Sequence, residues 1–356
     1  MSKENIELGA AEALSRTDCG DAILVDVREE AERVMGYPAG SIHHALSAMT
    51  PESLKSTADN NDQVVFICAG GVRSLQAAAM ARAAGVMAFS VQQGVAAWRE
   101  QNLPWAAADT AFASGRYARQ MILPEMGVDG QRKLKASRAV IVGAGGLGSP
   151  VALYLAAAGV GQLVLIDDDR VEMSNLHRQI LHAESRLGVH KVASASEVLT
   201  DVNSEISIHP LLERVSSKNV AGLIDQADVV VDCSDNLDTR YALNDACVAA
   251  QIPLVYGAIF RFEGQVSVFD SRNGPCYRCL FPEPPPADDA PNCAQAGVLG
   301  VLPGVIGTLQ ATEAIKVLLG LGRPLVGRLL LFNAMNGGFR EVKLRADSNC
   351  PACARG

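Results

Sequence analysis

Short apolar runs alternate with segments of helical pattern along most of this chain, and this alternation predicts strands and helices in turn. Near the N-terminus, residues 22–27 and 64–68 have the continuous apolar character of buried strands. The Ala-rich segment 74–84, which follows the second run, has the pattern of a helix. Together these segments predict a small α/β unit that closes near residue 104.

A second alternating series begins after residue 116 and predicts a larger sheet. The predicted strands are 139–142, 162–167, 229–232, a strand pair within 264–270, 329–332 and 340–344, and the predicted helices are 149–158 and 308–319. Strands that alternate with helices favour a doubly wound, Rossmann-like and mostly parallel sheet. The Pro- and Asp-rich residues 282–292 predict a mobile loop without regular structure.

The fold class predicted is therefore α/β in two domains. Residues 106–114 are small and weakly periodic, as in a linker. We expect a first domain at 1–107, a linker at 108–115 and a second domain at 116–356. The chain has 356 residues and a hydrophobic content of 49%, which is enough to fill two cores.

Charge and termini narrow the class of partner. The net charge is −8 and no run of Lys or Arg is present, which argues against a nucleic-acid backbone as a partner. The first residues lack the pattern of a signal peptide, and glycine or proline interrupts every long apolar stretch well short of a membrane span. We expect a cytoplasmic protein that binds neither nucleic acid nor membrane.

The nine cysteines are better explained as metal ligands and reactive thiols than as a disulfide framework, because their number is odd and no export signal is evident. Cys19, Cys233 and Cys247 lie in apolar or helical settings without a partner motif, so we expect them to be small core residues.

A glycine-rich turn is the first candidate for chemistry. Residues 143–148, Gly-Ala-Gly-Gly-Leu-Gly, follow an apolar strand and open a helix, where backbone N–H groups and the helix N-terminus favour a phosphate. Asp167 ends the next strand, where a carboxylate can bind a ribose, so an NAD-dependent dehydrogenase is the first hypothesis. The cationic and amide side chains that follow, among them Arg178, Gln179 and Lys191, favour ATP instead, because cations near one phosphate turn stabilise a leaving pyrophosphate.

Asp235 and Asn236 follow the strand at 229–232, at the carboxyl edge of the sheet, where Mg²⁺ could bridge a carboxylate and phosphates. The alternative for Asp235 is an aspartate that forms the turn before a helix. For Arg178 and Lys191 the alternative is a solvated helix face.

Two Cys-x-x-Cys pairs predict a zinc site. Cys276 and Cys279 form one pair, and Cys350 and Cys353 form the other, which supplies the four sulfurs that tetrahedral zinc prefers. Closing the loop between the pairs costs on the order of 4 kcal/mol, and a structural zinc site contributes on the order of 10 kcal/mol or more. We expect structural zinc that pins the C-terminal part of the second domain, with redox chemistry as the alternative.

A separate thiol, Cys68, ends a predicted strand and is followed by Ala-Gly-Gly-Val-Arg-Ser. Backbone N–H groups of such a turn converge on the sulfur and stabilise an anion. Arg73 lies one position closer to the cysteine than in a cysteine phosphatase loop, so the cradle is better sized for one extra sulfur than for phosphate. A persulfide is the expected occupant, and a merely buried cysteine is the alternative.

From Arg116 to Cys353 the chain resembles the MoeB/ThiF group of ubiquitin-activating-type adenylyltransferases. The resemblance rests on RYARQMIL, GAGGLG, SNLHRQ, Lys191, CSDN, PCYRCL, PNCAQAGV and CPAC, in that order. It implies that ATP and Mg²⁺ are bound by Gly146, Asp167, Asp169, Ser174, Asn175, Leu176, His177, Arg178, Gln179, Lys191, Asp235 and Asn236. It also implies that Arg119 reaches the nucleotide of a neighbouring subunit in a homodimer.

Members of this group attack the α-phosphate of ATP with the C-terminal glycine carboxylate of a small ubiquitin-like sulfur carrier ending in Gly-Gly. The resemblance therefore implies adenylylation with roles for Arg178 and Asp235. The implied carrier is that of molybdopterin synthesis, with the carrier of thiamine thiazole or another thiocarboxylate pathway as the alternative. A dehydrogenase and a pure zinc-bearing scaffold are the alternatives from other classes.

Residues 5–105 resemble the rhodanese family through DVRE, GSIH, CAGGVRS and GVAAW. This resemblance implies that Cys68 is the sulfur-carrying nucleophile, with Arg73 helping to hold the anion, and that a persulfide donor such as a cysteine desulfurase supplies it. Asp26 and Arg28 are expected to be structural. By resemblance to fused adenylyltransferase-sulfurtransferases, the Cys68 persulfide attacks the acyl-adenylate and Cys293 then releases the thiocarboxylate. The rhodanese-like unit leads here, which leaves open whether transfer occurs within one chain.

Overall fold

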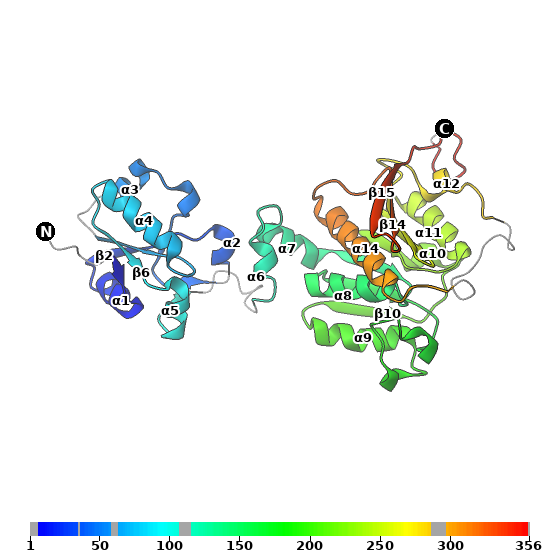
Figure 1. Ribbon diagram of the computed structural model, residues 1–356, viewed down its shortest axis with the longest axis horizontal. Helices are drawn as coiled ribbons and strands as arrows, with labels where there is room; N and C mark the ends of the chain where they lie inside the picture. Colours follow the sequence, from blue (N-terminus) through cyan, green and yellow to red (C-terminus); the bar gives the residue numbers. More distant parts are fainter. Residues whose placement is uncertain (1–5, 35, 58–62, 107–114, 286–296, 355–356) are drawn as a thin grey trace. The chain divides into compact units, whose positions relative to one another are not determined.

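A computed structural model describes residues 6–34, 36–57, 63–106, 115–285 and 297–354, with only the backbone of 55–57. The chain forms two compact units, Met1–Val128 and Asp129–Gly356 (Figure 1). Each unit is described by itself. The first unit takes in residues beyond the linker expected at 108–115, and the domain limits 1–107 and 116–356 stay predictions from the sequence. Within the described residues, none of the helices combines the length and the apolar character needed to cross a membrane.

The first unit is built on a parallel five-stranded sheet in the order β1-β6-β5-β2-β4. Its strands are β1 (Glu7–Leu8), β2 (Ala22–Asp26), β4 (Ile42–His43), β5 (Gln63–Ile67) and β6 (Ala88–Val91), and β3 (Tyr37–Pro38) pairs with β7 (Trp105–Ala106) outside it. Its helices are α1 (Ala10–Asp18), α2 (Glu30–Arg33), the 3-10 turn Leu46–Ala48, α3 (Pro51–Thr57), α4 (Val72–Ala83), α5 (Gly94–Glu100) and α6 (Ala118–Met121). The predicted strands at 22–27 and 64–68 and the helix at 74–84 correspond to β2, β5 and α4.

The core of the first unit packs on both faces of this sheet. Trp98 is fully buried in one cluster with Ile67 and Val91, and Phe66 is buried in another cluster with Ala77. Large side chains thus lie against the small side chains of α4, which is why an Ala-rich helix can pack closely on the strands.

The second unit is built on an eight-stranded sheet in the order β10-β9-β8-β11-β12-β13-β14-β15. Its strands are β8 (Arg138–Val142), β9 (Gln162–Ile166), β10 (Ser207–Leu211), β11 (Val229–Asp232), β12 (Leu254–Phe260), β13 (Glu263–Phe269), β14 (Arg328–Asn333) and β15 (Gly338–Lys343). Neighbours from β10 to β12 pair parallel, and neighbours from β12 to β15 pair antiparallel. The predicted doubly wound, mostly parallel class is confirmed for the part of the sheet from β10 to β12.

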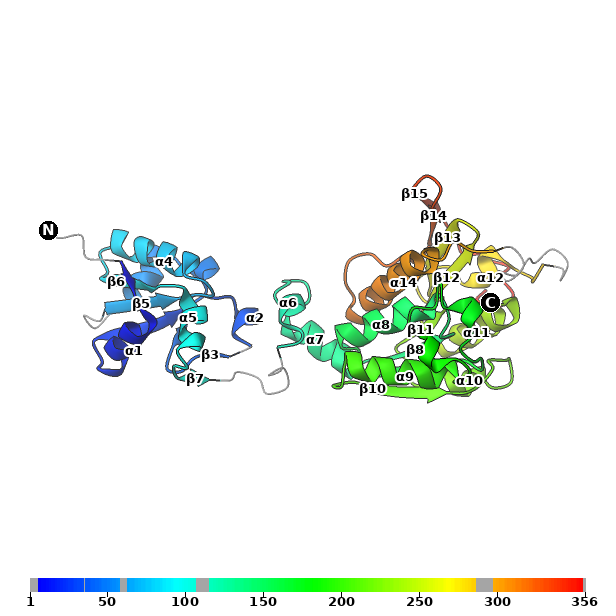
Figure 2. The same cartoon turned by 60° about the horizontal axis from the view of Figure 1, so that its bottom comes forward.

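Helices cover both faces of this sheet. They are α7 (Gly127–Ala136), which starts at the end of the first unit, α8 (Gly148–Ala158), α9 (Lys191–Val202), α10 (Val220–Leu223), α11 (Leu237–Ala250), α12 (Tyr277–Leu280) and α14 (Leu302–Leu319), with 3-10 turns at Met173–Asn175 and Glu184–Arg186. Figure 2 shows the sheet nearly edge-on, with α8, α9 and α14 on one face and α10 and α11 on the other. The chain changes face between β8 and β11, and the ligand crevice of such sheets lies at this switch.

Three predictions from the sequence are wrong in detail. The segment predicted as a strand pair at 264–270 lies in one strand, β13 (Glu263–Phe269), whose partners β12 and β14 lie on either side of it. Helix α14 starts at Leu302 rather than 308, because Pro303 fits a first helical turn and Gly307 lets the helix pack on α8. Cys19 is exposed at the end of α1, whereas Cys233 and Cys247 are buried as expected.

Trp98 offers a test of the first core. Its ring is fully buried, and its Nε1 donates to the Pro104 carbonyl at 2.9 Å. We expect Trp98→Ala to lower the opening free energy of the first unit by roughly 3–5 kcal/mol, and Trp98→Phe to lower it less. Native-state hydrogen exchange of the full chain measures this, with the second unit as internal control. Equal loss of protection in both units would contradict the assignment.

Candidate functional site

In the turn at residues 143–148, backbone atoms lie so close together that the glycine positions Gly143 and Gly148 have no room for a side chain. Gly143 has a positive φ of 98°, and a Cβ placed there would lie 2.7 Å from the Cys233 carbonyl oxygen. A Cβ on Gly148 would lie 1.8 Å from the Gly143 carbonyl oxygen. The turn therefore brings the ends of β8 and β11 together and starts α8 with its N–H groups directed at the crevice.

A cavity of about 810 Å³ opens at this turn. Eight of the predicted residues line it, and they come from the ends of several elements: Gly146, Asp167, Asp169, Arg178, Gln179, Lys191, Asp235 and Asn236. The structure thus brings most of the predicted nucleotide site together at the carboxyl edge of the sheet. A volume of this size is typical of small-ligand pockets.

Asp167 holds the turn and its surroundings. One carboxylate oxygen accepts the Ala144 N–H and the other accepts the Asp169 N–H, each at 2.8 Å. Burial raises the pKa of Asp167, and the nearby charge of Lys191 opposes that rise. The carboxylates of Asp167, Asp168 and Asp169 also lie within 4.8 Å of one another.

Lys191 is a buried cation at the start of α9. Its side chain is 6% exposed, and its Nζ donates to the Asp169 carboxylate at 2.8 Å. Burying an ammonium without a partner costs free energy, and the ion pair with Asp169 offsets this cost at the cavity wall. The solvated-helix-face alternative is therefore wrong for Lys191.

Arg178 is oriented by the segment before it. One guanidinium NH₂ donates to the Asn175 side-chain oxygen at 2.7 Å, and the other donates to the Ser174 carbonyl at 3.4 Å. The His177 ring also contacts the Ser174 carbonyl at 3.1 Å. The four residues before Arg178 do not line the cavity. In the structure they form the turn that positions Arg178: Ser174, Asn175, Leu176 and His177.

The β11–α11 junction supplies the opposite wall. Asp235 is exposed there, and the Asn236 side chain caps α11 by accepting the Thr239 N–H at 2.9 Å. Capping fixes the backbone at Asn236, and the carboxylate of Asp235 is left open to the cavity.

A buried charged pair beside the cavity escaped the sequence reasoning. Asp232 is 1% exposed, and its Oδ2 lies 3.8 Å from the Nε of Arg240. Neither atom has a hydrogen-bond partner within the described part of the chain. Burial raises the pKa of Asp232, and the charge of Arg240 opposes this. The one sequence signal for this site was an acidic residue, Asp232, at the end of the otherwise apolar run 229–232.

Aromatic rings complete the wall near this pair. Tyr256 and Tyr277 both line the cavity, with ring centroids 5.5 Å apart, and the guanidinium of Arg240 lies 5.2 Å from the Tyr256 ring centroid. Tyr277 directly follows Cys276, so the cysteine cluster and the cavity share a short stretch of chain. Arg119 lies exposed on α6, in the first unit, and its predicted contact with a nucleotide stays a prediction.

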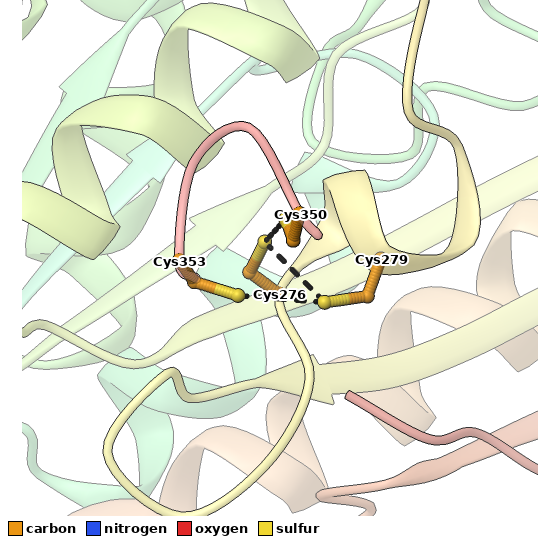
Figure 3. Close-up of side chains that lie close together, drawn as sticks. All are labelled: Cys276, Cys279, Cys350 and Cys353. Carbon is orange, nitrogen blue, oxygen red and sulfur yellow. Dashed lines mark hydrogen bonds between the residues drawn. The ribbon is translucent and has the colours of Figure 1, made fainter. Parts of the chain in front are cut away.

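The four cysteines of the two Cys-x-x-Cys pairs converge (Figure 3). The sulfur of Cys276 lies 4.0 Å from that of Cys279 and 3.5 Å from that of Cys350, and the sulfurs of Cys279 and Cys353 are 3.4 Å apart. Tetrahedral zinc with Zn–S bonds of about 2.3 Å needs sulfurs about 3.8 Å apart. The donor set and its spacing therefore fit zinc, and the Asp347 N–H donates to the Cys279 sulfur at 3.4 Å.

Cys68 lies beneath the turn between β5 and α4. Its sulfur accepts the Gly71 N–H at 3.2 Å and lies 3.3 Å from the Ser74 hydroxyl oxygen. Burial raises the pKa of Cys68, but hydrogen bonds from Ser74, Gly71 and Gly70 outweigh it, so the pKa is lowered. A Cβ on Gly94 would lie 2.0 Å from the Cys68 carbonyl oxygen, so α5 can approach the turn only through a glycine. The cradle expected around this sulfur is present.

Arg73 differs from expectation. Both of its terminal nitrogens donate to the Glu32 carboxylate at 2.6 Å, and the Glu32 side chain is only 13% exposed. Burial raises the pKa of Glu32, but these bonds hold it below its usual value. The guanidinium is thus committed to Glu32, and its charge reaches Cys68 only through space.

Asp26 and Arg28 form a buried ion pair at 2.7 Å, as expected of structural residues. Cys293 lies outside the described residues, and its role stays a prediction.

Comparisons with known proteins match one family to each of the two regions. Residues 117–352 match the ThiF family and residues 9–101 match a rhodanese-like domain. The protein is 50% identical over 240 residues to "Adenylyltransferase and sulfurtransferase MOCS3" of Xenopus laevis, which covers 67% of this chain and 53% of that protein. It is 50% identical over 243 residues to "Sulfur carrier protein adenylyltransferase" of Thermus thermophilus, covering 67% of this chain and 90% of that protein.

A solved structure of Escherichia coli MccB with MccA-N7isoASN shares the fold, with a TM-score of 0.61, 23% identity, and coverage of 67% of this chain and 75% of that chain. The chain spans about half the length of the MOCS3 relatives it matches, 53% in the Xenopus protein. Since the ThiF model covers most of the second unit, the chain belongs to the ThiF family and carries a rhodanese-like domain before it.

Proposed function

We propose that this protein uses ATP to adenylylate the C-terminal glycine carboxylate of a ubiquitin-like sulfur carrier protein, and then transfers sulfur to it from Cys68. The observation that carries this proposal is the cavity where the 143–148 turn meets two cations, Arg178 and Lys191. Such a site neutralises charge on departing phosphates. The Xenopus laevis relative is named for both activities, and the Thermus thermophilus relative is named for adenylylation of a sulfur carrier protein.

The proposed first step is nucleophilic attack at phosphorus. A carboxylate oxygen of the carrier forms a bond to the α-phosphorus of ATP, and the bond to the bridging oxygen breaks, so pyrophosphate leaves with the electron pair. Backbone N–H groups at the start of α8 stabilise the phosphates, and Arg178 and Lys191 stabilise the charge that builds on pyrophosphate.

The remaining residues have positioning roles in this proposal. Asp235, which lines the same cavity as Asp167 and Asp169, would hold Mg²⁺, and the ion would offset the negative charge of the phosphates. Gly146, Gln179 and Asn236 shape the nucleotide pocket. The turn of Ser174, Asn175, Leu176 and His177 orients Arg178. Arg119 would complete the nucleotide site of a second subunit, so a homodimer is part of the proposal.

Asp235 provides the test of this step. We expect Asp235→Ala to lower formation of both carrier adenylate and thiocarboxylate by roughly 100-fold or more, because Mg²⁺ would lose its protein ligand and no longer offset the charge of the phosphates. Intact-mass spectrometry of a Gly-Gly carrier incubated with ATP and Mg²⁺ measures the adenylate, and the same reaction with a persulfide donor and a dithiol reductant added measures the thiocarboxylate. Asp225→Ala, which removes an exposed acid away from the cavity, is the matched control and should match the parent. Undiminished adenylate with Asp235→Ala would rule out this role.

The proposed second step moves sulfur. The Cys68 thiolate attacks the terminal sulfur of a donor persulfide, as on a cysteine desulfurase, and the donor thiolate leaves. The resulting Cys68 persulfide attacks the carbonyl carbon of the adenylate and AMP leaves, so an acyl disulfide joins the carrier to Cys68. The Cys293 thiolate then attacks the Cys68 sulfur, which releases the carrier thiocarboxylate and leaves a Cys68–Cys293 disulfide for a dithiol reductant.

Replacing Cys293 separates these steps. With Cys293→Ala we expect adenylate to form at the parent rate, while thiocarboxylate turnover stops after the acyl disulfide accumulates on Cys68. Non-reducing mass spectrometry of the full chain detects this adduct. Cys19→Ala removes an exposed thiol and is the control. Full multiple turnover of thiocarboxylate by Cys293→Ala would refute the release step.

We also propose that Cys276, Cys279, Cys350 and Cys353 bind a structural zinc ion. Zinc would tie the C-terminal segment to the start of α12 and so support Tyr277 in the cavity wall. The carrier proposed is the small subunit of molybdopterin synthase, and the thiamine thiazole carrier is the alternative. Offering both carriers in one reaction with ATP distinguishes them by the mass of the product.

Zinc removal is expected to act on both stability and nucleotide binding. We expect Cys350→Ser to lose zinc, to lower the thermal midpoint by on the order of 10 °C, and to weaken ATP binding, because Tyr277 lines the cavity. Metal analysis, calorimetry and ATP titration measure these effects, with Cys19→Ser as control. Unchanged zinc content and midpoint in Cys350→Ser would contradict a structural site.

A further inference from the structure

A second serine lies behind the reactive thiol. Ser90 is in β6, the strand beside β5, and it is completely buried, as is Ser74 of α4. The Ser90 hydroxyl donates to the Ser74 hydroxyl oxygen at 2.9 Å. The Ser74 oxygen in turn lies 3.3 Å from the Cys68 sulfur. These three side chains therefore form a continuous buried chain that ends at the thiol.

Ser90 is unusual for its position. The other residues of β6, Ala88, Phe89 and Val91, are buried and apolar, and they pack into the two cores of the first unit. Burying a hydroxyl costs free energy unless it is hydrogen-bonded, and an alanine would fit the same strand. The bond to Ser74 satisfies the Ser90 hydroxyl, and it places a polar contact one step behind the site of chemistry.

The hydroxyl and thiol protons of the Ser90–Ser74–Cys68 series can be assigned to particular hydrogen bonds. Ser74 has one hydroxyl proton and two neighbours that can accept it, the Gly71 carbonyl at 3.0 Å and the Cys68 sulfur at 3.3 Å. When Cys68 is a thiol, its S–H can donate to Ser74 while Ser74 donates to Gly71. When Cys68 releases its proton to solvent, Ser74 can rotate and donate to the thiolate. In both arrangements Ser90 donates to Ser74.

A donor behind Ser74 strengthens what Ser74 does. A hydroxyl that accepts a hydrogen bond becomes a better donor, because the two bonds polarise each other, and the effect is larger where water is excluded. Ser90 also occupies one lone pair of the Ser74 oxygen, which limits the rotamers open to that hydroxyl. Both effects favour the thiolate of Cys68 over the thiol.

We propose that Ser90 is a positioning residue for the Cys68 thiolate and acts through the Ser74 hydroxyl. The proposal rests on the sulfur-carrying role of Cys68. Ser90, a residue of the core strand β6, would then help to stabilise the Cys68 thiolate in addition to the groups of the Cys68 turn. Substitution of Ser90 is therefore expected to change the reactivity of a thiol that it does not contact.

Two ion pairs lie near the turn, and Glu29, which acts on Arg73 through space, accepts a hydrogen bond from the Ser47 hydroxyl. Arg73 of α4, whose charge acts on Cys68, is bound to Glu32 of α2, and Asp26 at the end of β2 is bound to Arg28. Substituting a neutral serine in β6 leaves these pairs in place. A change in thiol reactivity in such a variant is then attributable to the hydroxyl chain.

The test is the pH dependence of Cys68 alkylation in the full-length protein. Iodoacetamide labelling is followed at the Cys68 peptide by mass spectrometry, which separates this thiol from the others. We expect Ser90→Ala to raise the pH midpoint of Cys68 alkylation by about half a pH unit to one pH unit. At a pH below this midpoint, labelling then slows about threefold to tenfold. Ser90→Thr, which keeps a hydroxyl, should remain close to the parent.

A double-mutant cycle with Ser74→Ala shows whether Ser90 acts through Ser74. Once Ser74 is alanine, adding Ser90→Ala should shift the midpoint no further. Ser41→Ala is the matched control, because the Ser41 hydroxyl is buried and has no hydrogen-bond partner among the described residues. An unchanged midpoint in Ser90→Ala, or an additive shift in the double variant, would overturn the proposal.

This experiment does not depend on sulfur transfer. If Cys68 carries no persulfide, a sulfur-transfer assay fails while the alkylation midpoints still shift as described. If the hydroxyl chain has no role, the midpoints stay fixed although sulfur transfer proceeds. The two failures are therefore distinguishable.

Discussion

The cavity of the second unit depends on the turn at residues 143–148, in which backbone approaches backbone with no room for a side chain. A Cβ on Gly148 would lie 1.8 Å from the Gly143 carbonyl oxygen, and a Cβ on Gly143 would lie 2.7 Å from the Cys233 carbonyl oxygen. This contact joins the ends of β8 and β11 and sets where α8 begins. Asp167 and Asp235 reach one cavity because the strands that carry them end at this same edge.

Both reactive regions treat anions in a similar way. In each, a glycine-rich turn leads into a helix start, and one nearby cation has a carboxylate partner: Lys191 with Asp169 in the second unit, and Arg73 with Glu32 in the first. A paired cation keeps its charge and position in a buried site, but it presents less net charge to solvent.

The sequence allowed prediction of whatever depends on local pattern. The turn after β8, the Asp167 position, the cysteine pairs and the Cys68 cradle each combine a spacing with a strand or helix boundary, and such signals are short in range. The Asp232–Arg240 pair was not predictable in this way, because two ordinary positions acquire meaning only when β11 and α11 pack together. The pairing of Arg73 with Glu32 was missed for the same reason, since it joins α4 to α2 across the first unit. Tertiary contacts between distant segments decided these cases.

The central proposal is that the carrier's terminal carboxylate attacks the α-phosphorus of ATP in the cavity beside the 143–148 turn. The most direct measurement uses a carrier whose C-terminal carboxylate is enriched in ¹⁸O, with unlabelled ATP, Mg²⁺ and a persulfide donor. If the claim is correct, the AMP released on thiocarboxylate formation contains one carboxylate oxygen and gains ¹⁸O in its phosphate. AMP without label, or label in orthophosphate alone, would contradict it.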